Sequence, residues 1–218
     1  MSGRAAVSLR AEQLTHRYGR RSTGVDQLAF VFDGPGAVAV TGPNGSGKST
    51  LLRILAGLLR PSAGHTALRL NGRDLPAHDR RAAVGLATPE LEFYDEFSAL
   101  ENLRFAGECR RLPDPADAAL VALERIGLGA RARDRVAAYS SGMKQRLRVA
   151  FAMLHQPAVL LLDEPGGHLD DAGRDAVRDV VREHAGRGLV VLATNDPQEA
   201  QLAERRLELH GRGLGDPS

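Results

Sequence analysis

Residues 42 to 50 read Gly42-Pro43-Asn44-Gly45-Ser46-Gly47-Lys48-Ser49-Thr50. This stretch fits the pattern G-x-x-x-x-G-K-[ST], with glycine, lysine and serine at the fixed positions. A short apolar run rich in β-branched residues, 36–41, precedes it and is typical of a buried parallel strand. An apolar helical pattern, 51–59, follows it and ends before Pro61. Strand, glycine loop and helix together are the context that this motif requires.

The chemistry of such a loop is specific to phosphate. Glycines let the backbone curl so that N–H groups point inward at phosphate oxygens, and the helix N-terminus adds partial positive charge. Lys48 is suited to contact the β- and γ-phosphates, and the Ser49 hydroxyl is suited to bind Mg²⁺. A chance glycine turn is the alternative, and the flanking strand and helix disfavour it. We therefore expect residues 42–50 to bind a nucleotide.

Composition limits the remaining possibilities. The 218 residues suit one large domain, or one domain with an inserted subdomain. The net charge of +2 is small and dispersed, so nothing indicates nucleic-acid binding. Cys109 is the only cysteine, which excludes a disulfide framework, and we expect it to be a small core residue. The apolar runs are of strand length, too short to cross a membrane, and the N-terminus lacks a signal-peptide pattern.

Strand and helix patterns alternate along most of the chain. Strands are predicted at residues 7–14, 28–32, 36–41, 66–70, 158–162, 189–193 and 207–209. Helices are predicted after the loop at 51–59, after Ser98, from Pro115 toward Ile126, from Ser141 to before Pro157, at 171–185 and from Pro197, with a loose tail at 211–218. The pattern predicts an α/β fold: a P-loop NTPase with a mainly parallel sheet core, a small antiparallel β edge and an inserted α-helical subdomain.

Three of these helices begin with recognisable caps. Ser98 with Glu101 forms a capping-box pattern, and so does Asp196 with Glu199. Asp114, followed directly by a proline, is a typical N-cap with proline at the first helical position. We expect each helix to begin at its cap.

Two acids follow the apolar run 159–162, Asp163 and Glu164. An acid at the carboxyl end of a buried strand is expected to lie beside the phosphate-loop strand, where Mg²⁺ would bind. Asp163 is suited to hold the ion, commonly through water, and Glu164 to orient or deprotonate an attacking water. Paired acids at a strand end are common by themselves, but this chain already contains Lys48. We therefore expect a Mg²⁺ site at Ser49 and Asp163.

Ser140, Ser141 and Gly142 open another predicted helix. Their hydroxyl and N–H groups could form a second phosphate-recognition surface at the helix N-terminus. Taken alone, the segment is more simply a serine-capped helix. The order of the motifs favours the first interpretation: phosphate loop, helical stretch, Ser-Ser-Gly, acidic strand end, and then Leu169-Asp170.

This combination resembles the ATP-binding subunits of ABC transporters, from about Tyr18 to Asn195. The resemblance implies that adenine stacks on Tyr18 and that residues 42–50 bind the phosphates of ATP. Ser140 to Gly142 would be the family signature, and residues 167–170 the loop through which two subunits communicate. In that family two copies pack head to tail, and each signature completes the partner's ATP site. A homodimer, or a heterodimer with another ABC ATPase subunit, is implied around two ATP–Mg²⁺.

The resemblance also implies a domain organisation and roles for the two acids. Asp163 would be the metal-side acid and Glu164 the catalytic acid. One ABC-type ATPase domain is expected over the whole chain. Its α/β core with the β edge would span approximately 1–85 and 157–210, and its helical insertion, which carries the signature, 86–156.

One departure from the family pattern lies in the segment 84–94. Pro89 stands where the family presents a glutamine to Mg²⁺ and the attacking water. Proline has no side-chain donor or acceptor, so that interaction is either absent or made by Thr88 or Glu90.

A second departure is Asn195, which stands at the place of the usual switch histidine. Its amide can still donate a hydrogen bond to a γ-phosphate oxygen, but it has no proton that titrates near neutrality. Glu164 and Lys48 are kept. We therefore expect slow but real ATP hydrolysis, with Glu164, Lys48 and Asn195 as the catalytic residues.

The leading prediction is the ATP-hydrolysing subunit of an ABC transporter, which drives separate membrane permease subunits. It would be cytoplasmic, peripheral on the inner face of the cell membrane through the permease. The permease is expected to dock near residues 88–102, where Leu91, Phe93, Tyr94 and Phe97 offer apolar side chains. Ordinary core packing of these four side chains is the alternative.

Other functions remain open at this point. A soluble ABC-type ATPase with a non-membrane partner is one alternative, and a hydrolysis-impaired subunit with a regulatory role is another. A GTPase or nucleotide kinase is disfavoured, because residues 194–196 lack the lysine of a guanine-reading motif. The membrane subunit would choose the substrate. The small size resembles short exporter subunits, including the haem-export type of cytochrome c maturation.

Overall fold

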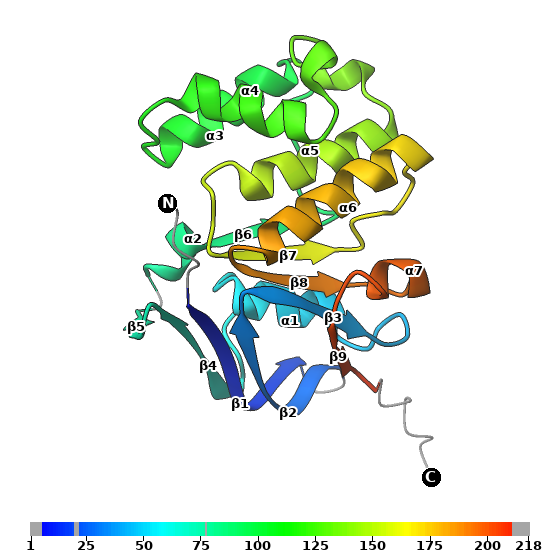
Figure 1. Cartoon of the computed structure of the whole chain (residues 1–218). Helices are drawn as coiled ribbons and strands as arrows, with labels where there is room; N and C mark the ends of the chain where they lie inside the picture. The colour runs from blue at the N-terminus through cyan, green and yellow to red at the C-terminus, as the bar shows by residue number, and fades with distance from the viewer. Residues whose placement is uncertain (1–5, 20–21, 77, 211–218) are drawn as a thin grey trace.

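The computed structural model describes residues 6–19, 22–76 and 78–210, and the predicted tail at 211–218 lies outside this part. A five-stranded sheet, parallel throughout, forms its centre (Figure 1). The strand order is β6 (Val84–Ala87), β7 (Val159–Asp163), β8 (Leu189–Ala193), β3 (Gly36–Thr41) and β9 (Arg205–Glu208). All five carboxyl ends therefore lie at one edge of the sheet, where the phosphate loop begins.

The antiparallel strands form a second sheet of their own. Its order is β2 (Ser22–Gly34), β1 (Val7–Tyr18), β4 (Ala63–Leu70) and β5 (Arg73–Leu75). The long strand β1 pairs with both β2 and β4, with register shifts in each pairing. In Figure 1 this sheet lies below the parallel sheet, with the first helix between them.

Helices cover both faces of the parallel sheet. On one side lies α1 (Lys48–Leu55), and on the other lie α5 (Ser141–Met153) and α6 (Asp171–Ala185), with α3 (Ala99–Cys109) and α4 (Pro115–Arg125) beyond them (Figure 1). Two single-turn helices, α2 (Arg80–Ala83) and α7 (Pro197–Ala200), and two short 3₁₀ turns, Gly129–Arg131 and Val136–Ala138, complete the order. The described part thus has the α/β architecture that the sequence predicts.

The core is divided by the parallel sheet into two clusters. Along β7, Leu160 and Leu162 pack toward α5 and α6, whereas Val159 and Leu161 pack toward α1 and the antiparallel sheet. All four side chains are fully buried. This is the expected consequence of a strand whose side chains alternate between two covered faces. Burial on both faces fixes the register of β7 and so the position of the acids at its end.

Several predicted boundaries are confirmed. The helix α6 and the strand β8 have the predicted bounds. Ser98 and Glu101 form the complete capping box of α3, and Asp114 caps α4. One expectation is wrong: Cys109 is exposed at the end of α3 rather than buried in the core.

Candidate functional site

The loop between β3 and α1 contains two positions that only glycine can occupy. Gly42 has a φ of 145° and Gly47 a φ of 98°. A Cβ atom would lie 2.3 Å from the carbonyl oxygen of Leu209 at Gly42, and 1.6 Å from that of Gly24 at Gly47. Both distances are far below van der Waals contact, so any side chain would push the loop apart. The glycines thus let the loop lie against its neighbours with its N–H groups at the N-terminus of α1.

Lys48 is buried in this loop, with its ammonium group surrounded by acceptors. The Nζ atom donates to the carbonyl oxygens of Gly42 at 2.9 Å and Pro43 at 3.3 Å, and to Asn195 Oδ1 at 2.6 Å. Its distance to Glu164 Oε1 is 3.9 Å. An ammonium group has three donors, and all three are used here. The structure therefore brings together the three residues that the sequence predicts as catalytic.

Asn195 joins the phosphate loop to the end of the acidic strand. Its Nδ2 donates to Asn44 Oδ1 in the loop, and its backbone N–H lies 3.5 Å from Glu164 Oε2. Asn195 reaches this position because β8, which precedes it, lies between β7 and β3. The acids at the end of β7 therefore lie near the phosphate loop, although β8 separates their strand from β3. The intervening strand puts an amide, rather than the acids alone, next to Lys48.

Asp163 is almost completely buried and lacks a hydrogen-bond partner in the described part of the chain. Burial raises the pKa of its carboxyl group, because the charged form is poorly solvated. The Ser49 hydroxyl is close enough to oppose this shift, without reaching good hydrogen-bond geometry. An unpaired buried carboxylate beside a hydroxyl suits a small hard cation that takes oxygen ligands. The predicted Mg²⁺ pair thus has the donor chemistry for that ion.

Few protein ligands are available for such an ion. The described residues contain no cluster of three or more histidine, cysteine or acidic side chains that could hold a metal. Mg²⁺ does not need one, since it is commonly bound by one or two carboxylates together with water and substrate phosphates. Nearby, the buried Ser46 hydroxyl also lacks a partner among the described residues. The two polar groups without partners, the Ser46 hydroxyl and the Asp163 carboxylate, lie where phosphate and Mg²⁺ are expected to bind.

Tyr18 lies at the end of β1, over the start of α1. Its hydroxyl is 3.2 Å from Thr50 Oγ1, and its ring makes an edge contact with His16 at 4.7 Å between centroids. The side chain is 45% exposed. It therefore lies beside the loop with much of its surface open to a ligand, as stacking on adenine would require.

Ser140 to Gly142 lie at the N-terminus of α5. Ser140 caps the helix by accepting a hydrogen bond from the N–H of Met143 at 3.2 Å. Both serines are exposed, and Gly142 packs close to the carbonyl of His168. Within the part of the chain that the structure covers, no hydrogen bond joins this segment to residues 42–50. A single chain does not bring the two predicted phosphate-binding elements together.

Two polar residues around Glu164 are not identified by any sequence pattern as neighbours of the site. Gln145 on α5 donates from Nε2 to the backbone carbonyl of Glu164 at 3.0 Å. Glu199 does not close the predicted capping box of α7; its Oε1 instead accepts from the N–H of Gly166 at 2.7 Å. Burial raises the pKa of Glu199. No sequence pattern marks Gln145, which lies inside a helix. Glu199 matches the capping-box pattern with Asp196, which points to the wrong partner. Only the tertiary contacts show what these two side chains bind.

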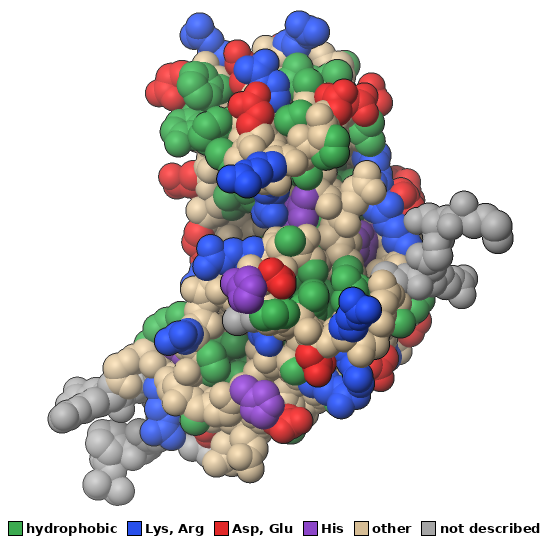
Figure 2. Space-filling view, turned by 90° about the vertical axis from the view of Figure 1, so that its left-hand side faces the viewer, with side chains coloured by type: hydrophobic (Ala, Val, Ile, Leu, Met, Phe, Trp, Pro, Cys, Tyr) green, Lys and Arg blue, Asp and Glu red, His purple; other side chains and the backbone are tan. Residues whose placement is uncertain are grey.

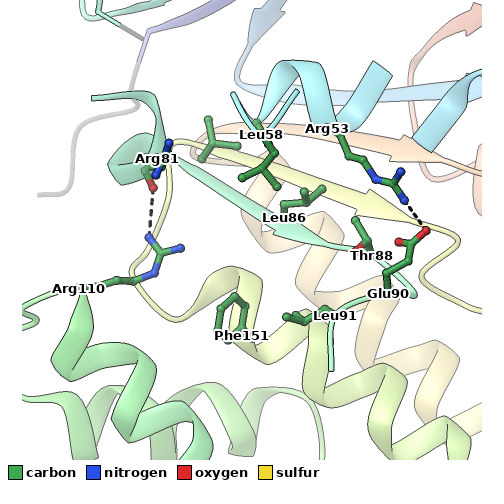
Figure 3. A pocket seen from close by; sticks show the side chains of 11 residues that line it. Arg53, Leu58, Arg81, Leu86, Thr88, Glu90, Leu91, Arg110 and Phe151 are labelled. Atoms are coloured by element: carbon green, nitrogen blue, oxygen red, sulfur yellow. Dashed lines mark hydrogen bonds and ion pairs between the residues drawn. The ribbon is translucent and has the colours of Figure 1, made fainter. Parts of the chain in front are cut away.

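The segment that follows β6 borders a groove of about 600 Å³ (Figure 3). Leu58, Leu86 and Phe151 supply apolar walls, and Leu91 lines the same groove. Glu90, a candidate to replace the missing glutamine, forms an ion pair with Arg53 of α1. Thr88, the other candidate, is buried. In this structure the Glu90 carboxylate is paired with Arg53, so Glu90 would have to leave that partner in order to substitute for the glutamine.

The four apolar side chains predicted to meet a partner divide into two groups. Leu91 lines the groove, while Phe93 packs against Phe151 and the core at 6.1 Å between ring centroids. Tyr94 and Phe97 are about half exposed, and their rings contact each other in a tilted arrangement with 5.5 Å between centroids. On the face drawn in Figure 2, hydrophobic side chains gather near the upper end, where α3 and α4 lie. The alternative of core packing thus holds for Phe93.

None of the helices in the described ranges combines the length and the apolar character needed to cross a bilayer.

Comparison with known proteins identifies a family and relatives. The family described as "ABC transporter" matches residues 25–167. The uncharacterized ABC transporter ATP-binding protein YdbJ of Bacillus subtilis is 40% identical over 149 residues, which cover 68% of this chain and 48% of YdbJ. The lipoprotein-releasing system ATP-binding protein LolD of Pseudomonas syringae is 34% identical over 226 residues, covering 98% and 99% of the two chains. This chain therefore spans about half the length of the first relative and nearly all of the second.

A solved structure shares the fold. It is described as a dimeric post-hydrolysis state of an ATP-binding cassette bound to ADP and Pi. The two structures superpose with a TM-score of 0.83 at 21% identity, over 94% of this chain and 97% of that chain.

Proposed function

This chain belongs to the ABC transporter family, and on that premise we propose that it binds and slowly hydrolyses ATP to drive separate membrane subunits. One observation carries the proposal: Lys48, Asn195 and Glu164 converge at the ends of β3, β8 and β7. Lys48 Nζ lies 2.6 Å from Asn195 Oδ1 and 3.9 Å from Glu164 Oε1. A cation, a hydrogen-bonding amide and a carboxylate at this spacing suit phosphoryl transfer from ATP to water.

Each residue of the site has a distinct part in this proposal. The backbone N–H groups of residues 42–50 and the Lys48 ammonium bind the phosphates, and the Tyr18 ring supports adenine. Ser49 and Asp163 would hold Mg²⁺, which when bound neutralises charge on the phosphates. Glu164 accepts the proton of the attacking water or orients it. Asn195 changes partners from Lys48 to the terminal phosphate.

A second subunit completes the site in this proposal. Ser140 to Gly142 are exposed at the N-terminus of α5, where N–H groups and the helix dipole favour an anion. These residues make no hydrogen bond with the phosphate loop of their own chain in the described structure. A head-to-tail dimer, of identical or related subunits, would set them against the partner's ATP. The site is then shared by two chains.

The groove of Figure 3 is the surface that we assign to the membrane partner. Its walls are apolar, and Arg81 and Arg110 line one end of it. Arg110 donates to the backbone carbonyl of Arg81 at 3.1 Å, and neither guanidinium has a carboxylate partner among the described residues. The occupant that fits is an amphipathic helix of a membrane-spanning subunit, with an acidic side chain near these arginines. The chain would then lie at the cytoplasmic face of the membrane through that subunit.

ATP hydrolysis by the purified protein tests the proposal. We expect a slow Mg²⁺-dependent rate that falls by at least about 100-fold in Glu164→Gln, because the carboxylate acts on the attacking water. The Glu164→Gln protein should still bind ATP, whereas Lys48→Ala should lose most of its ATP affinity. A wild-type rate no higher than that of Glu164→Gln would reject hydrolysis and favour a regulatory subunit.

A further inference from the structure

Three hydrogen bonds connect the groove to the backbone of Glu164. Arg148 Nε donates to the carbonyl of Leu91 at 2.9 Å, and Leu91 lines the groove (Figure 3). Arg148 Nη1 donates to Gln145 Oε1 at 3.0 Å. Gln145 Nε2 then donates to the carbonyl of Glu164 at 3.0 Å. The two side chains lie on one face of α5 and bridge the segment after β6 to the turn after β7.

The orientation of the Gln145 amide is fixed by its two partners. A guanidinium group can only donate, so the oxygen of the amide must face Arg148. The nitrogen of the amide must then face the carbonyl of Glu164. Gln145 is only 6% exposed, and an amide that is buried without its hydrogen bonds is strongly unfavourable. The bridge therefore has one favourable arrangement.

The backbone of Glu164 needs such support. Its φ is +47°, a left-handed conformation that is unfavourable for a non-glycine residue. Its N–H donates to the carbonyl of Ala193 at 2.8 Å, and its own carbonyl accepts from Gly167 N–H at 3.2 Å and from Gln145. Among the described residues, the hydrogen-bond and ion-pair contacts of the carboxylate itself are long, 3.9 Å to Lys48 Nζ and 3.5 Å to Asn195 N. The backbone, rather than the side chain's own contacts, therefore sets where the carboxylate lies.

We infer that Gln145 and Arg148 are positioning residues for Glu164. They link the position of the Glu164 backbone to the segment after β6 that lines the groove. The inference rests on the proposed ATP hydrolysis. A partner that moves Leu91 changes the anchor of Arg148, and the Gln145 amide passes this change to the carbonyl of Glu164. Occupancy of the groove and the geometry of hydrolysis are then linked through two side chains of α5.

The test is steady-state hydrolysis by Gln145→Met, which keeps the side-chain length and removes both hydrogen bonds. We expect kcat to fall about 10- to 100-fold, because a misplaced catalytic group loses this much, with KM for ATP within about twofold. Arg148→Met should show a smaller loss of kcat, since the amide remains but is no longer oriented. Arg148→Lys, which keeps one charged donor, should recover part of it.

Lys144→Met is the matched control. Lys144 also joins α5 to the same segment, through an ion pair with Asp95 at 2.8 Å, but in the described structure its side chain makes no hydrogen bond or ion pair with Gln145 or Glu164. Its kcat should equal that of the wild type. Thermal unfolding of all variants identifies any loss that follows from instability, and the part-exposed Arg148 keeps the test open if Gln145→Met unfolds.

A double variant separates positioning from a merely structural role. If Gln145 acts through Glu164, adding Gln145→Met to Glu164→Gln should lower the single-turnover rate no further. The inference would be overturned if Gln145→Met lowered the rate of Glu164→Gln by the same factor as it lowers the rate of the wild type. The inference would also be overturned if the kcat of Gln145→Met equalled that of the wild type, provided that the wild-type kcat clearly exceeds that of Glu164→Gln. A wild type no faster than Glu164→Gln would reject the proposed function and, with it, this inference.

Discussion

Asn195 is the residue through which the phosphate loop and the acidic strand end meet. Its amide oxygen accepts from Lys48, its amide nitrogen donates to Asn44, and its backbone N–H faces Glu164. An amide can serve both a cation and a phosphate oxygen, but it cannot exchange a proton near neutral pH. Asn195 therefore holds Lys48 in place, but it provides no group that titrates near neutral pH.

Replacing Asn195 by histidine tests this choice. We expect Asn195→His to raise kcat by up to about tenfold, which is less than a fully positioned general acid–base group contributes. The rate should also gain a pH dependence near the ordinary histidine pKa of about 6.5. The measurement is a pH–rate profile of ATP hydrolysis from about pH 5.5 to about 8.5, which brackets that pKa. Asn195→Gln, which keeps an amide, is the control and should gain no such dependence; an Asn195→His profile like that of the wild type would contradict the prediction.

At the level of elements, α6 is held against the sheet by a face that contains one buried histidine. His184 is 1% exposed near the end of the helix. Burial, together with the charges of Arg187 and Arg125, lowers the pKa of His184 to about 4. The folded chain therefore holds this imidazole neutral across the physiological range.

The lowered pKa predicts how stability depends on pH. His184 has an ordinary pKa of 6.5 and about 4 when folded, so the unfolded chain binds its proton more readily between these values. The free energy of unfolding therefore falls as the pH drops from 6.5 toward about 4, by about 3 kcal/mol in all, and this loss levels off below the folded pKa. Chemical denaturation at several pH values from about 7.5 to about 4.5 measures this loss.

His184→Met is the comparison for this measurement. The pKa of His155 is also lowered to about 4 by burial, so it contributes equally to both proteins and cancels in the difference. The variant should lose less stability on acidification than the wild type. Parallel pH dependences for the two proteins would show that His184 does not carry the effect.

At the scale of the whole molecule, the two predicted phosphate-binding elements of one chain are separate. Lys48 lies buried at the edge of the parallel sheet, and Ser141 is exposed at the start of α5. In the described ranges no hydrogen bond joins these two elements. A second copy that packs head to tail would supply the missing half to each site.

Mixing two inactive variants tests this arrangement. Lys48→Met removes the cation from the loop, and Ser141→Glu sets a carboxylate against the partner's phosphates without harming the helix start, where acids are favourable. Each variant alone should have little ATPase activity. Mixed dimers contain one site with both an intact Lys48 and an intact Ser141, so the mixture should regain activity. No recovery, despite exchange of subunits confirmed by co-purification of an untagged variant with an affinity-tagged one, would contradict a shared site.

Local patterns in the sequence determined the elements and the residue types of the site. Glycines at 42 and 47, the caps at Ser98 and Asp114, and the bounds of α6 follow from sterics and hydrogen bonds that act within a few residues. The same short range explains the failures. Glu199 matches a capping box in sequence but binds Gly166 across the fold.

Only the tertiary structure decided which side chains meet. The order of strands in the sheet depends on how the whole core packs, and it placed β8 between β7 and β3. That order brings Asn195 to Lys48, 147 residues away in sequence, and no local pattern records the contact. The same holds for Gln145, whose burial and contact with Glu164 follow from the packing of α5 on the sheet. The sequence by itself determined that a phosphate loop and its accompanying acids are present, because their patterns are local, and the packing of the core decided how these groups are held together.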